Sequence, residues 1–220
     1  MVMAILVALR EACADALALL LPVSCAGCGE PDVSLCERCA LALVPDPRRT
    51  RVPAPGGDVV VWSGLAFDGV AARVVRAIKE DGRTGLAVSL APALHAALAR
   101  VGAHDAVLVP MPTSRAAYRR RGFRVPEVLL RRAGRRGRRL LRPARRTGDQ
   151  RGLDRDGRRR NVAHSLVAAD ASGLRVVVVD DVVTTGASLA EAVRALRAAG
   201  ADVVAAVTVA ATPRRHPTTR

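Results

Sequence analysis

The stretch VVVVDDVVTTGASL, residues 176–189, constrains the fold more than any other part of this sequence. Four consecutive valines are typical of a strand that is covered on both faces, as in a parallel sheet. The run ends in two adjacent aspartates, Asp180 and Asp181, followed by small hydroxyl residues and a glycine where a helix is expected to begin. Because open parallel sheets bind ligands beyond the carboxyl ends of their strands, this stretch predicts a ligand site.

Strand-like and helix-like segments alternate along most of the chain. Apolar runs predict strands at residues 59–67, 105–112, 174–180 and 201–210. Amphipathic spacing predicts helices at residues 69–82, 86–102 and 187–200. Residues 115–160 hold too many glycines among their arginines to form one uniform helix. The alternation predicts an α/β fold with a mostly parallel sheet flanked by helices.

The chain divides into a small N-terminal part and a larger domain. We expect an N-terminal helix with a four-cysteine module (1–44), a Pro- and Gly-rich linker (45–57), the α/β domain (58–211) and a tail (212–220). The apolar N-terminus is interrupted by Arg10, Glu11 and Asp15, which argues against a membrane span and a signal peptide. We therefore expect a cytoplasmic protein.

Four of the five cysteines form two CxxC pairs, in the sequences CAGC and CERC. They are Cys25, Cys28, Cys36 and Cys39. Each pair can present two thiolates from a tight turn, and together the pairs supply the tetrahedral sulfur set that zinc prefers. This spacing predicts a structural zinc site. Redox chemistry and paired disulfides are the alternatives, and a reducing compartment disfavours both. Cys13 is expected to fill core space.

The net charge of +15 comes almost wholly from arginine, because Lys79 is the only lysine. Such a charge suits nucleic acids or small molecules that carry several phosphates. Arginine replaces lysine throughout, so part of the charge can reflect genome composition. The charge alone therefore does not separate a DNA-binding protein from an enzyme that handles phosphates.

The residues after the aspartates have the properties of a phosphate site. Thr184 to Ser188 surround the start of the expected helix, where free backbone N–H groups and the positive end of the helix dipole attract phosphate. The two carboxylates repel each other unless hydroxyl groups or Mg²⁺ compensate them. A suitable ligand therefore has a phosphate for the helix N-terminus, a diol whose hydroxyl groups reach the carboxylates, and a diphosphate that chelates Mg²⁺. Phosphoribosyl pyrophosphate (PRPP) is such a ligand.

VVVVDDVVTTGAS resembles the PRPP-binding signature of type I phosphoribosyltransferases. Other stretches sharpen this resemblance, namely LLLPVSC, the two CxxC pairs, IKEDG, VPMPTSR, RRRGF and a TxxQ…RxxN segment. Together, over roughly residues 16–211, they resemble the ComF family, which is similar to the amidophosphoribosyltransferase-like branch. The resemblance implies a type I phosphoribosyltransferase fold with a small N-terminal zinc-ribbon-like module.

The resemblance also implies roles for individual residues. The PRPP-binding loop would comprise Asp180, Asp181, Val182, Val183, Thr184, Thr185, Gly186, Ala187 and Ser188, with the aspartates on the ribose hydroxyls and the last five residues on the 5′-phosphate. The pyrophosphate loop would comprise Thr113, Ser114 and Arg115. A flexible loop would be marked by Thr147, Gln150, Arg158 and Asn161. Lys79 would lie near the diphosphate. The implied catalytic residues are Asp180, Asp181, Arg115, Lys79 and Gln150.

Several of these residues have plainer interpretations. The acid pair can be a solvated strand end, Arg115 can belong to a solvated face, and Lys79 can stabilise the end of its helix. One segment departs from the family: Arg124 and Val125 stand where its members usually have Asn-Gln after RGF. If this segment recognises the acceptor, the identity of the acceptor here is open.

The leading functional hypothesis is transfer of phosphoribosyl from Mg²⁺-bound PRPP to a nitrogen acceptor, linked to competence and DNA uptake through the family. The alternative is a non-enzymatic, basic, zinc-containing protein that binds single-stranded DNA or DNA-processing partners and uses PRPP as a signal. The scarcity of aromatic residues argues against base stacking. Purine or pyrimidine salvage ranks third. The acceptor and the oligomeric state, a homo-oligomer among the options, are left open.

Overall fold

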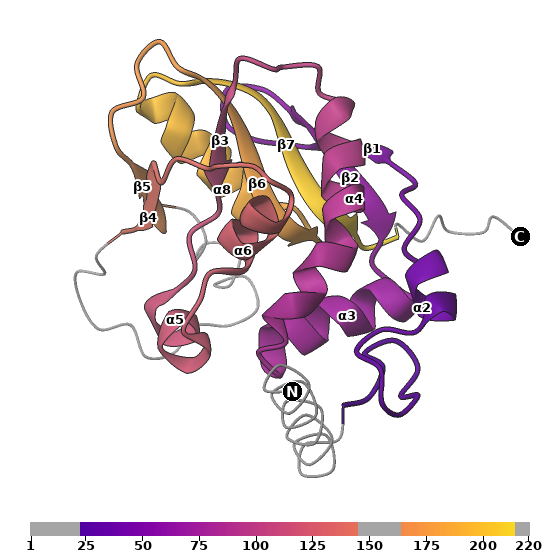
Figure 1. Ribbon diagram of the computed structural model, residues 1–220. Helices are drawn as coiled ribbons and strands as arrows, with labels where there is room; N and C mark the ends of the chain where they lie inside the picture. Colours follow the sequence, from indigo (N-terminus) through magenta and orange to yellow (C-terminus); the bar gives the residue numbers. More distant parts are fainter. Residues whose placement is uncertain (1–22, 145–163, 214–220) are drawn as a thin grey trace, which may run out of the picture.

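The computed structural model describes residues 23–144 and 164–213 and is built on a central five-stranded sheet (Figure 1). The strands lie in the order β1-β2-β7-β6-β3, with β2, β7, β6 and β3 parallel and β1 antiparallel to β2. Their bounds are Arg48–Val52 (β1), Val59–Ala66 (β2), Val107–Pro110 (β3), Arg175–Val183 (β6) and Asp202–Ala211 (β7). The predicted α/β fold with a mostly parallel sheet is confirmed.

Helices cover both faces of the sheet. Helices α3, α4 and α6 pack on one face and α8 on the other (Figure 1). The helices are α2 (Glu37–Leu41), α3 (Gly69–Glu80), α4 (Ala87–Ala99), α5 (Arg115–Arg121), α6 (Val125–Arg132) and α8 (Ala187–Ala198), with a 3₁₀ turn at Thr84–Leu86. A separate two-stranded sheet joins β4 (Leu141–Pro143) and β5 (Leu166–Ala168) and packs beside α8.

The four valines of β6 show why an uninterrupted apolar run forms a central strand. Val176 to Val179 are each at most 1% exposed. Because successive side chains of a strand point to opposite faces, Val177 and Val179 join the apolar cluster under α3, α4 and α6, while Val176 and Val178 join the one under α8. Both faces therefore need apolar residues, as the sequence predicted.

One expected loop is a strand. Arg48–Val52, within the stretch predicted as a linker, forms β1 and pairs antiparallel with β2. Its arginines and the prolines around it led to the linker interpretation. However, β1 lies at the edge of the sheet and only Val52 is buried, so charged side chains are tolerated and discourage pairing with another chain.

The arginine-rich segment is divided by glycines, as expected. Helix α5 ends at Gly122, whose φ is 77°, and α6 is followed by Gly134, whose φ is 63°. Among the residues that the structure describes, no helix combines the length and the apolar character needed to cross a bilayer. The predicted N-terminal helix and Cys13 lie outside the described residues.

Candidate functional site

The two adjacent aspartates lie within β6, not after its end. The strand continues to Val183 and keeps its pairing with β7, in which Asp180 lies opposite Thr208 and Val183 opposite Ala211. The prediction that the strand ends at residue 180 is therefore wrong, because backbone pairing with β7 holds the chain extended past the charges. The acids still lie close to the carboxyl end of the strand, where the fold is expected to bind a ligand.

Lys79 compensates the charge of Asp181. Its Nζ atom, on the last turn of α3, lies 2.8 Å from Asp181 Oδ1, and the two side chains are 26% and 12% exposed. The contact joins residues 102 positions apart in the chain. From the sequence, hydroxyl groups or Mg²⁺ were expected to compensate the acids, and Lys79 was placed near the diphosphate; in the structure, Lys79 pairs directly with one acid.

The carboxyl group of Asp180 has a raised pKa. Its Oδ1 atom accepts a hydrogen bond from the backbone N–H of Asp181 at 2.8 Å. Burial, followed by the nearby charge of Asp181, raises the pKa of Asp180 to about 8, although the Asp181 N–H and Lys79 act in the opposite direction. At neutral pH the raised pKa favours the protonated form of Asp180, beside the 2.8 Å contact between Lys79 and Asp181.

The loop after β6 leaves the N-terminus of α8 open. Gly186 caps the helix without a side-chain hydrogen bond and has a φ of 82°, in the left-handed region. A Cβ atom there would also lie 2.7 Å from Cγ2 of Val52 on β1. Both constraints require glycine. Thr184, Thr185, Ala187 and Ser188 around it are exposed. The first-turn N–H groups of α8 can therefore reach an anion.

The predicted pyrophosphate loop leaves the same edge of the sheet. Strand β3 pairs parallel with β6, and the N–H of Met111 donates to the carbonyl of Val179 at 2.8 Å. Thr113 follows in the loop. Ser114 caps α5, because its Oγ accepts from the N–H of Ala117 at 3.2 Å. Arg115 begins α5 and is exposed, which also fits a solvated face. The structure thus brings both predicted loops to one edge of the sheet.

The predicted flexible-loop residues, Thr147, Gln150, Arg158 and Asn161, lie outside the described residues.

The four cysteines of the two CxxC pairs converge. The Sγ atoms of Cys25, Cys28, Cys36 and Cys39 all lie within 4.8 Å of one another, and those of Cys28 and Cys36 are 3.6 Å apart. Four sulfurs around zinc at about 2.3 Å are separated by about 3.8 Å. None of the four is in a disulfide. The donor set and its spacing therefore fit a structural zinc ion.

Backbone donors favour the thiolate at Cys25. Burial raises its pKa, but N–H groups, led by those of Cys36 at 3.3 Å and Gly27 at 3.4 Å, outweigh this effect and lower the pKa to about 6. At Cys36 the N–H of Cys39 lowers the pKa, whereas Glu30, burial and the neighbouring thiols raise it to about 12. A divalent cation bound by the four sulfurs would offset the repulsion between neighbouring thiolates.

The four-cysteine module packs on the helix that carries Lys79. Arg73 Nε of α3 donates to the carbonyl of Gly27, and Arg83 donates to the carbonyl of Ser34 at 3.0 Å. A Cβ atom on Gly27 would lie only 2.5 Å from Cys39 Sγ. Sequence analysis did not single out Gly27 or Arg73, because these contacts depend on how the module meets α3.

Part of the chain matches a known family. Residues 122–219, which include β6, the exposed loop and α8, match the phosphoribosyl transferase domain. The chain is 59% identical over 43 residues to an orotate phosphoribosyltransferase of Pyrobaculum calidifontis, covering 20% of this chain and 22% of the relative. It is 60% identical over 38 residues to that of Bartonella quintana, covering 17% and 20%. The chain thus spans about a fifth of the length of these curated relatives. The fold and the matched residues together show that the chain contains a phosphoribosyltransferase domain.

Proposed function

We propose that this chain binds PRPP with Mg²⁺ and transfers its phosphoribosyl group to a nitrogen acceptor, releasing pyrophosphate, as a ComF-like phosphoribosyltransferase. The observation that supports the proposal is the arrangement at the carboxyl edge of the sheet. There, two adjacent acids, one of them paired with Lys79, precede an open helix N-terminus and lie beside the loop that follows β3.

Each part of the ligand has a matching group. The 5′-phosphate binds the N–H groups of the Thr184–Ser188 loop, helped by the dipole of the 12-residue helix α8. The ribose hydroxyls donate to Asp180 and Asp181. The Nζ atom of Lys79, 2.8 Å from Asp181 Oδ1, holds this carboxyl group in place as an acceptor. The diphosphate lies toward Thr113, Ser114 and Arg115, whose guanidinium group is exposed at the start of α5.

The reaction exchanges one bond at the anomeric carbon. The bond from C1 to the diphosphate oxygen breaks, a bond from C1 to the acceptor nitrogen forms, and that nitrogen loses a proton. Positive charge grows on the ribose and negative charge on the leaving diphosphate. Asp180 and Asp181 orient the ribose, and Arg115 stabilises the diphosphate. Mg²⁺ bound with PRPP supplies further charge neutralisation at the leaving group.

The acceptor is the least defined partner. Arg124, which departs from the family sequence, stacks over Tyr118 at 4.4 Å from the ring centroid and lies 3.8 Å from Glu127. Its guanidinium group is therefore engaged within α5 and α6. The curated relatives carry the name orotate phosphoribosyltransferase, so orotate belongs among the acceptors to test.

A second candidate function follows from charge. Residues 115–142 are rich in arginine and contain Glu127 as their only acid, and Arg131, Arg132, Arg135 and Arg136 are exposed. This surface supports the alternative of a DNA-binding accessory protein in competence, located in the cytoplasm, that uses PRPP as a signal. Binding through phosphates predicts a steep salt dependence. Retention of single-stranded DNA that is weak and insensitive to salt would exclude this candidate.

Calorimetry with PRPP and Mg²⁺ tests the primary proposal. The double variant Asp180→Asn with Asp181→Asn should weaken PRPP binding by about a hundredfold or more, because both carboxyl groups proposed to accept from the ribose hydroxyls are lost. The matched control is Asp105→Asn with Asp202→Asn, which removes two exposed acids paired with Arg175. Pyrophosphate release with a panel of amines, purines and orotate then identifies the acceptor. Unchanged binding by the site variant refutes the proposal.

A further inference from the structure

The β4–β5 hairpin presents one set of backbone groups to α8. Ala144 N–H donates to the carbonyl of Ser165 at 2.8 Å, so Ser165 faces β4. Because neighbouring peptide groups of a strand point to opposite sides, the N–H and the carbonyl of Leu166 point away from β4. Leu166 lies opposite Pro143 in the register and is only 9% exposed. Its polar groups therefore need partners outside the hairpin.

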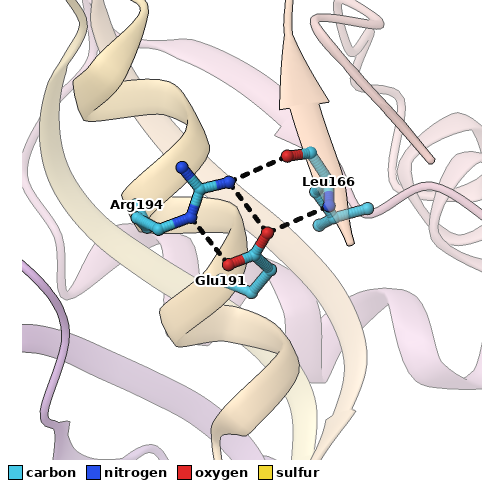
Figure 2. Close-up of polar contacts among 3 residues, drawn as sticks. All are labelled: Leu166, Glu191 and Arg194. Carbon is cyan, nitrogen blue, oxygen red and sulfur yellow. Dashed lines mark hydrogen bonds and ion pairs between the residues drawn. The ribbon is translucent and has the colours of Figure 1, made fainter. Parts of the chain in front are cut away.

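Two side chains of α8 provide these partners (Figure 2). Glu191 Oε1 accepts from the N–H of Leu166 at 2.9 Å, and Arg194 Nη2 donates to the Leu166 carbonyl at 2.9 Å. The two side chains also bind each other, from Arg194 Nε to Glu191 Oε2 at 2.8 Å and from Nη2 to Oε1 at 2.9 Å. Glu191 and Arg194 thus contact both polar groups of Leu166 as an adjacent strand would.

Glu191 is buried and Arg194 is partly exposed. The Glu191 side chain is 4% exposed and that of Arg194 22% exposed. Burial raises the pKa of Glu191, but Arg194 and the N–H groups of Leu166 and His164 lower it overall, so the carboxylate stays ionised. Buried ion pairs add little stability over apolar residues of the same shape, but they fix geometry. Leu166 also packs with Leu189 and Val193 of α8 in one apolar cluster.

Helix α8 therefore connects the Thr184–Gly186 loop with the β4–β5 hairpin. Its N-terminus follows the Thr184–Gly186 loop directly, and its next turns hold β5 through the Leu166 backbone. We propose that Glu191 and Arg194 are positioning residues that join the β4–β5 hairpin and the phosphate-binding end of α8 into one rigid unit, which binds a phosphorylated ligand more tightly than an α8 without the hairpin. The ligand part of this inference rests on the proposed function.

Amide hydrogen exchange tests the attachment without any ligand. Glu191→Ala should speed exchange at the Leu166 amide by about tenfold or more, because its hydrogen bond to a charged acceptor is lost. Glu191→Gln keeps an oxygen acceptor and should retain most of the protection, and it also covers the case in which the alanine variant does not fold. The matched control is Arg197→Ala, because Arg197 lies on the same helix but donates to the carbonyls of Pro55 and Gly57. Unchanged exchange at Leu166 in Glu191→Ala overturns the attachment.

Calorimetry with PRPP and Mg²⁺ tests the positioning role. Glu191→Ala should raise the dissociation constant by about tenfold, Glu191→Gln should restore most of the affinity, and Arg197→Ala should change it less than twofold. If Leu166 loses protection while the dissociation constant stays constant, the pair is only structural and the positioning role is overturned. If the wild-type protein binds no PRPP, the proposed function fails and the positioning role fails with it. Faster exchange at Leu166 would still establish the attachment.

Discussion

Two regions of the molecule gather candidate ligand-binding groups around a tight turn that contains glycine: the four-cysteine module (residues 23–44) and the β6–α8 unit (residues 175–198). Different forces hold these two regions together. In the β6–α8 unit, Val176 to Val179, Leu189, Val193 and Leu196 are each at most 1% exposed. In the module, the apolar side chains Val23, Val33, Leu41 and Val44 are exposed, and its own buried cluster consists of three cysteines, Cys25, Cys36 and Cys39. Leu43 is buried, but it belongs to the core of the α/β domain.

This difference separates two ways to build a binding site. Close packing holds the β6–α8 unit, so the Thr184–Ser188 loop needs no ligand to keep its shape. The module has too small a core to hold four sulfurs together, and metal binding would have to supply that free energy. The predictions below test this comparison, from the largest expected effect to the smallest.

Removal of the metal should unfold the module and spare the α/β domain. Zinc sites of this kind contribute about 10 kcal/mol or more of apparent binding free energy. We expect native mass spectrometry to show one zinc ion per chain. A chelator, or Cys25→Ser with Cys28→Ser, should expose residues 23–44 to protease while the domain keeps its own thermal transition. An unchanged cleavage pattern in the metal-free protein would contradict the comparison.

Substitution of Gly186 should destabilise the domain. Ala at this position meets a φ of 82° and a Val52 methyl group at 2.7 Å. The backbone costs about 1–2 kcal/mol and overpacking a further 1–3 kcal/mol, so urea unfolding should show a loss of about 3 kcal/mol. Gly85→Ala is the control, because its Cβ would meet no atom within 4 Å. Val52→Ala in the Gly186→Ala background should recover only the part of the lost unfolding free energy that overpacking causes. A full recovery would show that the backbone conformation costs nothing.

Substitution of Gly27 should weaken metal binding and leave the domain stable. Its Cβ would lie 2.5 Å from Cys39 Sγ, so one zinc ligand must move. We expect zinc affinity, measured by chelator competition, to fall about tenfold, since small displacements around a metal cost such factors. Gly29→Ala separates the causes, because Gly29 has a φ of 85° but open space around it. Equal losses in both variants would show that the contact with Cys39 Sγ is not what weakens zinc binding.

The affinity for PRPP should increase with pH up to about 8. Asp180 has a pKa of about 8 in the ligand-free protein, and we expect the ribose to bind its ionised form. Below that pH, each unit of decrease should weaken binding by up to about tenfold, and above it the affinity should level off. Calorimetry between about pH 6.5 and 9 measures this slope, above the phosphate pKa of about 6.

The variant Asp180→Asn is the control for this pH dependence. It should lose the pH dependence of PRPP binding together with most of the affinity.

The same pKa shift lowers folding stability as the pH rises, because the unfolded carboxyl ionises near 3.8 while the folded one keeps its proton to about 8. Asp180→Asn should therefore raise the melting temperature at pH 8 by a few degrees. A wild-type affinity that does not change with pH would show that Asp180 binds ligand in its protonated form.

Local patterns made most of the fold predictable. The valine run of β6, the amphipathic spacing of α3 and α8 and the paired CxxC sequences each act over a few residues, so the elements and the cysteine cluster could be predicted. Strand β1 was missed because its charged sequence is typical of a loop, and only its pairing with β2 makes it a strand.

Contacts between distant residues could not be predicted. Lys79 was noted as the only lysine, but its pairing with Asp181 depends on how α3 crosses the sheet. Periodicity placed Leu189, Val193 and Leu196 on the buried side of α8 and gave no reason to bury Glu191, which the hairpin covers. The close approach of Gly27 to Cys39 likewise follows from the folded module alone.

The sequence by itself determined the parallel sheet, the acid pair before a helix N-terminus and the four sulfur ligands, because hydrophobic periodicity and motif spacing are properties of neighbouring residues. The tertiary structure decided the raised pKa of Asp180, the partner of Lys79 and the attachment of the hairpin to α8. These depend on burial and on distances between residues far apart in the chain, which packing alone sets.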